Sequence, residues 1–315
     1  MIARILQLVD LVETSDSETM AELGDLVSRH TVTQDLTAVP ACALFIKLLN
    51  IPVAKLSLQD YKLFLADRGR LIARNAQNQL RETAINASHF LPTDSTILVL
   101  GNSPALRTLL EIAPPRRAYT SVKATLDLLL GLNIDAKLVQ ANTYATLIDQ
   151  VDFCLVDCHV VCKNGGLVAP MGTFTLAVVC KALSKPFYCI TPTFNFVALF
   201  FLNHHDLADW RQTASTGCTS AASATSSSAK SKINSTSATS AVNAATSATS
   251  TRATIAPRLN TSPALNTSLD SARELELSDM DYTPPEFISL LFTNAGALTP
   301  SAVAEQITTV SLENM

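Results

Sequence analysis

The spacing of apolar residues changes at Thr96, and this change constrains the fold more than any other feature of the chain. Thr96–Leu100 is a continuous run of β-branched and aliphatic residues, and the turn sequence Gly101–Pro104 follows it directly. Leucines at helical spacing come next, so the segment predicts a strand, a turn and a helix. Ser103 is suited to cap this helix because its hydroxyl can accept a hydrogen bond from an early amide, and Pro104 has no amide to leave unsatisfied.

Strands and helices continue to alternate after this segment. The pattern predicts strands at Ala136–Val139, Phe153–Val156 and Phe187–Ile190, and helices at Ser121–Leu130 and Thr173–Ala182. Strands that alternate with helices form a parallel sheet with helices on both faces. The fold class that we expect is therefore α/β.

Residues 1–94 show helical spacing only. One apolar stripe runs from Ile2 to Val12 and a second from Leu65 to Phe90, and arginines flank the second stripe. Both stripes are typical of amphipathic helices, so we predict an all-helical N-terminal domain over 1–94. The arginine-rich face is typical of a solvated helix surface, and a surface for a partner protein is the alternative.

The composition collapses to Ser, Thr, Ala and Asn over residues 213–269, with almost no aromatic side chains. Such a segment cannot bury enough apolar surface to offset the ordering of its backbone, which costs about 1–2 kcal/mol per residue. Patterned sequence resumes after it, so we expect a disordered insertion within a second domain that comprises 95–212 and 270–315.

Composition also argues against some partners and locations. A net charge of −4 and a pI near 5.7 provide no basic surface for neutralising phosphates, so we do not expect nucleic-acid binding. Asp10 interrupts the first apolar run and no uncharged run approaches the roughly 18 residues of a membrane span, so we predict a cytoplasmic protein that binds no membrane. The seven cysteines are odd in number, and reduced, mostly buried thiols are expected.

Three glycine-containing turns could together form a ligand pocket. The first follows the strand at Thr96–Leu100, and open α/β sheets bind ligands at the carboxyl ends of their strands. The other two follow the strand at Phe153–Val156 and could add free backbone amides that suit an anion. Purely structural turns explain the same residues, so both interpretations stay open. The candidate residues are Gly101, Asn102, Ser103, Asn164, Gly165, Gly166, Gly172 and Thr173.

Motifs for catalysis and metal binding are weak. The chain has no Gly-x-Ser-x-Gly elbow, no glycine-rich phosphate loop with lysine and no His-Glu-x-x-His motif. Cys154, Cys158, His159 and Cys162 are residue types that bind zinc, but their spacing does not give two compact ligand pairs. Core packing is the better explanation, so we predict no catalytic residue, no metal and no cofactor.

A series of short motifs resembles a known family in both sequence and order. The motifs are Asp67-Arg68-Gly69-Arg70, Ile97 to Pro104, Asn164-Gly165-Gly166, Met171-Gly172-Thr173, Lys185-Pro186-Phe187-Tyr188, Phe194-Asn195-Phe196-Val197 with Leu202-Asn203, and Tyr282 to Val303. In this order they are similar to the alpha, beta and delta subunits of eukaryotic translation initiation factor 2B. The last two blocks favour the alpha subunit.

The resemblance implies an N-terminal helical domain and a C-terminal Rossmann-like domain that pairs with a second copy through its apolar surface. It also implies a regulatory subunit that works with the beta and delta subunits and helps them sense phosphorylation of the alpha subunit of initiation factor 2, while other chains carry out nucleotide exchange. The apolar residues that we expect at the dimer or subunit interface are Phe194, Phe196, Tyr282 and Phe292.

The same fold is shared with methylthioribose-phosphate and ribose-bisphosphate isomerases. On the resemblance, their catalytic cysteine and aspartate correspond to Gly101 and His159, and a glycine can supply neither a thiol nor a proton. The segment from Glu111 to Asn133 is also shorter than in family members, which implies loss of most of a strand and of a phosphate loop. Ala169-Pro170 replaces an Asn-Lys pair. We therefore expect a non-enzymatic chain, with a sugar-phosphate isomerase or a metabolite sensor as the alternatives.

Overall fold

The computed structural model describes residues 1–31, 35–51, 57–92, 94–215 and 279–307. The described residues of Met1–Cys218 and Ser278–Met315 form one compact unit. The predicted disordered insertion at 213–269 lies outside the described residues from position 216 onward, so its disorder stays a prediction.

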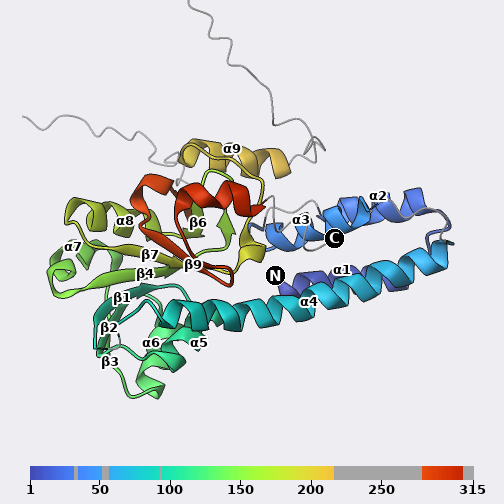
Figure 1. Cartoon of the computed structure of the whole chain (residues 1–315). Helices are drawn as coiled ribbons and strands as arrows, with labels where there is room; N and C mark the ends of the chain where they lie inside the picture. The colour runs from blue at the N-terminus through green and yellow to red at the C-terminus, as the bar shows by residue number, and fades with distance from the viewer. Residues whose placement is uncertain (32–34, 52–56, 93, 216–278, 308–315) are drawn as a thin grey trace, which may run out of the picture. The chain divides into compact units, whose positions relative to one another are not determined.

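The chain begins with helices, as predicted. They are α1 (Ile2–Thr14), α2 (Met20–Thr31), α3 (Val39–Leu49) and the long α4 (Leu58–Ser88). Helix α4 lies along α1 and continues toward the sheet (Figure 1). Its first half buries Leu65 against Val9 and Phe45, whereas its second half buries Ala84 and Ala87 in the core of the sheet. Because one helix serves both cores, the predicted domain boundary at 94 stays a prediction.

The main sheet has the strand order β10-β9-β7-β4-β1-β2-β3, and all its neighbouring strands are parallel except the β9/β10 pair. The predicted α/β class is therefore confirmed, with one antiparallel edge. Strand β4 ends one residue later than predicted, at a buried aspartate. The strands are β1 (Thr96–Leu100), β2 (Arg117–Thr120), β3 (Asp135–Leu138), β4 (Phe153–Asp157), β7 (Phe187–Ile190), β9 (Leu290–Thr293) and β10 (Gly296–Leu298).

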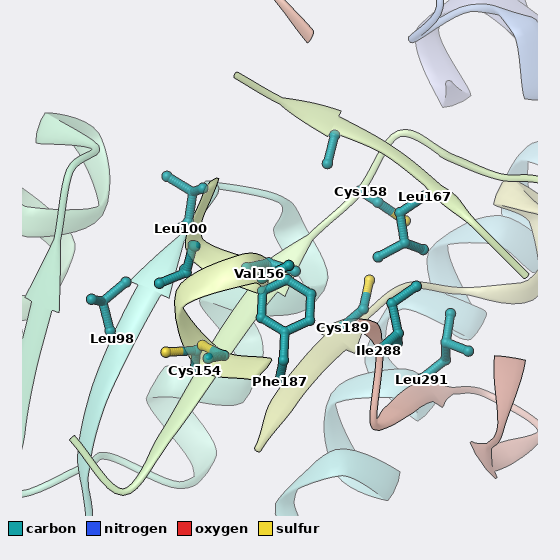
Figure 2. Packing of buried hydrophobic residues seen from close by; sticks show 14 of the residues in the cluster. Leu98, Leu100, Cys154, Val156, Cys158, Leu167, Phe187, Cys189, Ile288 and Leu291 are labelled. Carbon is teal, nitrogen blue, oxygen red and sulfur yellow. The ribbon is translucent and has the colours of Figure 1, made fainter. Parts of the chain in front are cut away.

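Alternate residues of the central strands pack on opposite faces of the sheet, as the period of a strand requires. Leu98 and Val156 lie on the face covered by α7 (Tyr144–Leu147) and α8 (Thr173–Ala182), and Figure 2 shows part of this cluster. Ile97 and Leu155 lie on the other face, covered by α4, α5 (Pro104–Ile112) and α6 (Lys123–Gly131). The result is a parallel sheet between two helical layers.

A second, smaller sheet is antiparallel and has the order β5-β6-β8. Its strands are β5 (Val160–Val161), β6 (Leu167–Pro170) and β8 (Met280–Thr283), and helix α9 (His204–Ser215) packs against it. Strand β8 follows the undescribed residues 216–278 and pairs with β6 along Leu167–Pro170. The C-terminal segment is thus joined to the rest of the unit by backbone hydrogen bonds.

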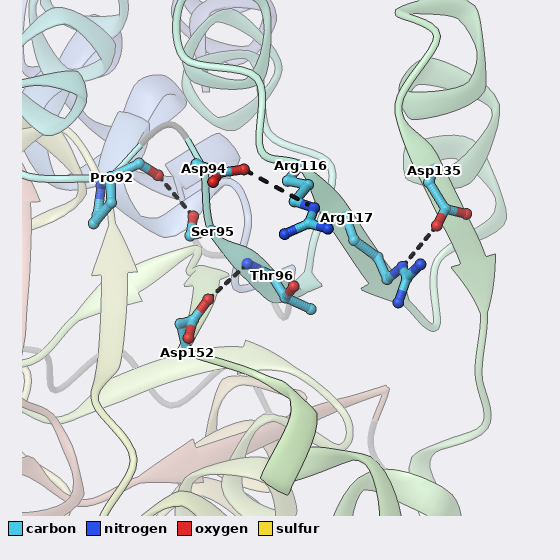
Figure 3. Close-up of polar contacts among 8 residues, drawn as sticks. All are labelled: Pro92, Asp94, Ser95, Thr96, Arg116, Arg117, Asp135 and Asp152. Carbon is cyan, nitrogen blue, oxygen red and sulfur yellow. Dashed lines mark hydrogen bonds and ion pairs between the residues drawn. The ribbon is translucent and has the colours of Figure 1, made fainter.

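The expectation that the segment between Glu111 and Asn133 lacks most of a strand was wrong. Strand β2 is present as Arg117–Thr120 and pairs with both β1 and β3. Figure 3 shows the polar contacts at this end of the sheet, where Arg117 Nε donates to Asp135 Oδ2 at 2.6 Å and the amide of Thr96 donates to Asp152 at 2.8 Å. Four residues suffice because Ala118 and Tyr119 are buried between the neighbouring layers.

The predicted start of helix α5 is confirmed. Ser103 accepts a hydrogen bond from the amide of Leu106 at 3.3 Å, and Pro104 is the first helical residue. Within the described ranges, no helix combines the length and the hydropathy that crossing a membrane requires.

Candidate functional site

A pocket of about 660 Å³ lies at the carboxyl ends of strands β1, β4 and β7, a volume in the ordinary range for small-molecule sites. The strand ends contribute the turn after β1, the residues that follow β4, and Ile190. Ile2, Thr37 and Leu80 of the helical region also line it. The pocket therefore lies where an open α/β sheet is expected to bind ligands, next to the start of helix α5.

Asp157, the last residue of β4, binds the first amides of helix α5 at this end of the sheet. Its Oδ2 atom accepts hydrogen bonds from the amide of Asn102 at 2.8 Å and from the amide of Ser103 at 2.5 Å. Amides at the start of a helix have no partner within the helix and bind anions readily. In this chain the amides of Asn102 and Ser103 both donate to the carboxyl group of Asp157 instead.

Gly101 makes room for this carboxyl group. Its φ of 125° lies in the region that favours glycine, and a Cβ atom at this position would overlap the carboxyl oxygens of Asp157. The hydroxyl of Thr125 donates to the Gly101 carbonyl and holds the turn from the side of helix α6. The carboxyl group of Asp157 therefore fills the space that a side chain at position 101 would need.

Burial raises the pKa of the Asp157 carboxyl, and the amides of Ser103 and Asn102 together with nearby His159 oppose the rise. Among the residues that the structure describes, Oδ1 of Asp157 has no hydrogen-bond partner. The side chain is only 3% exposed. Burying a polar atom without a hydrogen-bond partner costs free energy. The two hydrogen bonds to Oδ2 are therefore what hold the carboxyl group in this position.

The amides at the start of helix α8 also donate to a carboxyl group of the chain. Asp281 of β8 accepts hydrogen bonds through Oδ2 from the amide of Gly172 at 2.9 Å and the amide of Phe174 at 3.0 Å. Burial raises the pKa of the Asp281 carboxyl to about 6. Thr173 donates from its hydroxyl to the carbonyl of Pro170 at 2.7 Å. The amides predicted at Gly172 and Thr173 thus face a carboxylate of the chain itself.

The Asn164-Gly165-Gly166 turn packs against the C-terminal segment. Asn164 donates from its side-chain amide to the carbonyl of Phe201 at 2.7 Å and to the Tyr282 hydroxyl at 2.8 Å. A Cβ atom on Gly165 would overlap the carbonyl of Pro300, and one on Gly166 would overlap the Tyr282 ring. Of the predicted ligand residues, Gly101, Asn102 and Ser103 line the pocket, whereas the other two turns are not among its lining residues.

The model of the initiation factor 2 subunit family matches residues 2–300. The chain belongs to this family. A translation initiation factor eIF2B subunit alpha from Dictyostelium discoideum is 28% identical over 95% of this chain and 88% of its own length. The eIF2B subunit alpha from Caenorhabditis elegans is 21% identical over 97% of this chain and 91% of its own length.

The family assignment agrees with the fold. A solved chain of the tetrameric eIF2B-beta2-delta2 complex from C. thermophilum superimposes with a TM-score of 0.65 at 14% identity, and the match covers 97% of this chain and 86% of that one. At this identity the similarity shows the fold alone. The predicted family and its alpha-like character are confirmed by the sequence relatives.

The four apolar residues predicted at an interface of this family member lie inside its own core. Phe194 and Phe196 are each 8% exposed, and Tyr282 and Phe292 are 0% and 1% exposed. Phe194 lines the pocket, and Phe292 packs its ring against Tyr188 with a centroid distance of 5.3 Å. A second chain would find little of these side chains to contact.

The cysteines near strand β4 are also packed inside the chain. Cys154, Cys158 and Cys162 are buried free thiols, and His159 lines the pocket. A hydrogen bond with Cys180 and burial raise the pKa of Cys154, and burial raises that of Cys162, so both stay protonated. No group of three or more His, Cys, Asp or Glu side chains arranged to hold a metal occurs in the part of the chain that the structure describes.

Sequence reasoning missed the two aspartates that define these helix starts. Asp157 ends an apolar, fully buried strand, and a carboxylate at the carboxyl end of a central strand was a usable sign of a polar site. Asp281 lies just after the long insertion, and no local pattern connects it with Gly172, which is 109 residues away in sequence.

Proposed function

We propose that this chain is a regulatory, non-catalytic subunit of the nucleotide-exchange complex for translation initiation factor 2. The observation that carries the proposal is the full-length similarity to two eIF2B alpha subunits, each matched over at least 95% of this chain. Similarity over a whole chain favours a shared role, whereas similarity over a fragment favours a shared domain only.

The pocket supports a role without catalysis. Gly101 offers no nucleophile at the turn after β1, and the carboxyl group of Asp157 is engaged with two backbone amides. A general acid or base needs access to its substrate proton, and a nucleophile needs a reactive atom. Neither requirement is met by this pair.

The proposed partners are the beta and delta subunits, a second copy of the chain, and the alpha subunit of initiation factor 2. Since the four predicted aromatic residues are buried, the dimer contact is assigned to the exposed Phe200 and Leu202, which are 59% and 67% exposed. Neighbouring exposed apolar side chains of this size are commonly covered by another protein. The helical region, with exposed arginines along α4, is the proposed face for phosphorylated initiation factor 2.

Co-purification with tagged beta and delta subunits and light scattering of the isolated chain test the proposal. A dimer that recovers both subunits is expected. In the double variant Phe200→Asp with Leu202→Asp, the dimer should dissociate, because a carboxylate buried without a partner costs several kcal/mol. Leu130→Asp, at a residue that is 52% exposed on helix α6, is the matched control and should leave the dimer intact. A monomer that recovers neither subunit would contradict the proposed role.

A further inference from the structure

The pocket at the carboxyl end of the sheet has walls that suit an uncharged molecule. Apolar surface comes from Val122, Ile190 and Phe194, and polar groups come from Asn102 and Asn195. Among the described residues that line it there is no lysine or arginine, and the groups that can carry positive charge are the amino terminus of Met1 and His159. Burial lowers the pKa of the Met1 amino group, which favours its uncharged form. A phosphoryl group bound here would therefore lack the strong charge-assisted hydrogen bonds that lysine and arginine provide.

The amides that would otherwise bind an anion are already used. Asn102 and Ser103 both donate to Oδ2 of Asp157, so a phosphoryl oxygen would have to displace a buried carboxyl group from its two donors. That carboxyl group also fills the space beside Gly101, where a Cβ atom would overlap it. The occupied amides and the filled space beside Gly101 therefore both oppose the binding of an anion at the start of helix α5.

The other oxygen of Asp157 faces the turn after β1. Oδ1 is buried and has no hydrogen-bond partner among the described residues, and it is the atom that a Cβ on Gly101 would overlap first. The carboxyl group is thus enclosed by Gly101 on one side and by the two amides on the other.

We propose that Asp157 determines the specificity of this pocket as a built-in substitute for a bound anion, so that the pocket excludes phosphoryl compounds and admits uncharged molecules. The residue acts by occupying the amides of Asn102 and Ser103, and a variant with a shorter side chain at 157 frees them. This inference concerns the pocket alone and does not depend on the proposed subunit role.

The experiment compares three full-length proteins with a matched pair of probes, ribose and ribose 5-phosphate. The proteins are the wild type, Asp157→Ser, which frees the two amides, and Asp157→Asn, which keeps an acceptor oxygen in the same place. Calorimetric titration measures affinity, and the NMR signal of Asn102 in protein labelled with ¹⁵N-asparagine reports on the site. Thermal unfolding of each variant checks that it is folded.

Ribose 5-phosphate should bind Asp157→Ser at least about tenfold more tightly than it binds the wild type or Asp157→Asn, with a shift of the Asn102 amide signal. Its affinity for the last two proteins should be equal, and the affinity for ribose should be the same in all three. Equal affinity of ribose 5-phosphate for the wild type and Asp157→Ser would overturn the proposal, as would a gain in Asp157→Asn equal to that in Asp157→Ser. If Asp157→Ser does not fold, saturable movement of the wild-type Asn102 signal by ribose 5-phosphate still overturns it, and the absence of movement supports it.

Discussion

Asn86 on helix α4 donates a hydrogen bond from its side-chain amide to the carbonyl oxygen of Thr293 at 3.0 Å, and the same nitrogen lies 2.9 Å from the carbonyl of Asn294. These residues are 207 positions apart in the sequence, and the contact joins the long N-terminal helix to the end of strand β9. The two carbonyl groups therefore depend on one side chain for part of their hydrogen bonding.

Replacing Asn86 with Ala should lower the free energy of unfolding by about 1–3 kcal/mol, because partly buried carbonyl groups lose a donor. Asn78→Ala is the matched control, since Asn78 is exposed on the same helix and alanine is the better helix former there. Urea unfolding followed by circular dichroism measures both variants. Equal stability of the two would show that the contact contributes nothing.

Gly69 on α4 lies directly against Val9 on α1, so a Cβ atom at position 69 would overlap the valine methyl group. Gly69→Ala should therefore destabilise the chain by about 1–3 kcal/mol, since valine is stiff and cannot move aside. Among the described residues, nothing lies within 4 Å of the place that a Cβ atom on Gly24 of helix α2 would take, and Gly24→Ala should stabilise by about 0.5–1 kcal/mol. Chemical unfolding of the pair tests this, and a loss of stability in both or in neither would refute the packing argument.

Sequence periodicity predicted the elements whose pattern is local. Strands β1 and β7 and helix α8 have the predicted bounds, because a continuous apolar run or a regular helical stripe is visible within a single element. Strand β2 was missed because it is only four residues long, begins with Arg117, and follows two prolines. Its pairing with strands on both sides, rather than its own propensity, determines its structure.

The candidate site could be predicted only in part. The turn at Gly101–Ser103 was placed correctly at a strand end, because the strand, the turn residues and the helix cap are consecutive in sequence. The occupant of its amides could not be found in that way, since Asp157 lies 55 residues from Asn102. Likewise, the aromatic residues chosen for an interface are apolar enough for either a surface contact or a core, and only the tertiary structure separates the two.

The overlap between Gly101 and Asp157 predicts that substitutions at the two positions are coupled. Gly101→Ala should cost about 2–4 kcal/mol, from the positive φ and from the overlap with the carboxyl group. In a chain that also carries Asp157→Gly, the overlap is gone and only the backbone strain remains, so the cost of Gly101→Ala should fall by about 1–3 kcal/mol. A double-mutant cycle from urea unfolding measures this coupling, and strictly additive costs would contradict it.

Asp281 predicts a specific dependence of stability on pH. Its pKa in the folded chain is about 6, above the ordinary value of 3.8, so the folded chain holds this proton more tightly than the unfolded chain does. The stabilisation is complete below the unfolded pKa and is lost as the pH rises through the folded pKa, a decrease of about 1–3 kcal/mol. Asp281→Asn keeps an acceptor for the amides of Gly172 and Phe174 but cannot titrate.

The free energy of unfolding should therefore decrease less in Asp281→Asn than in the wild type between about pH 4 and about pH 7. Burial also raises the pKa of Asp157, and its contribution should remain in both proteins because that residue is unchanged. Urea unfolding at a series of pH values gives the two curves. Parallel curves would mean that Asp281 keeps its ordinary pKa in the folded chain, and that the helix α8 amides offset the whole effect of burial.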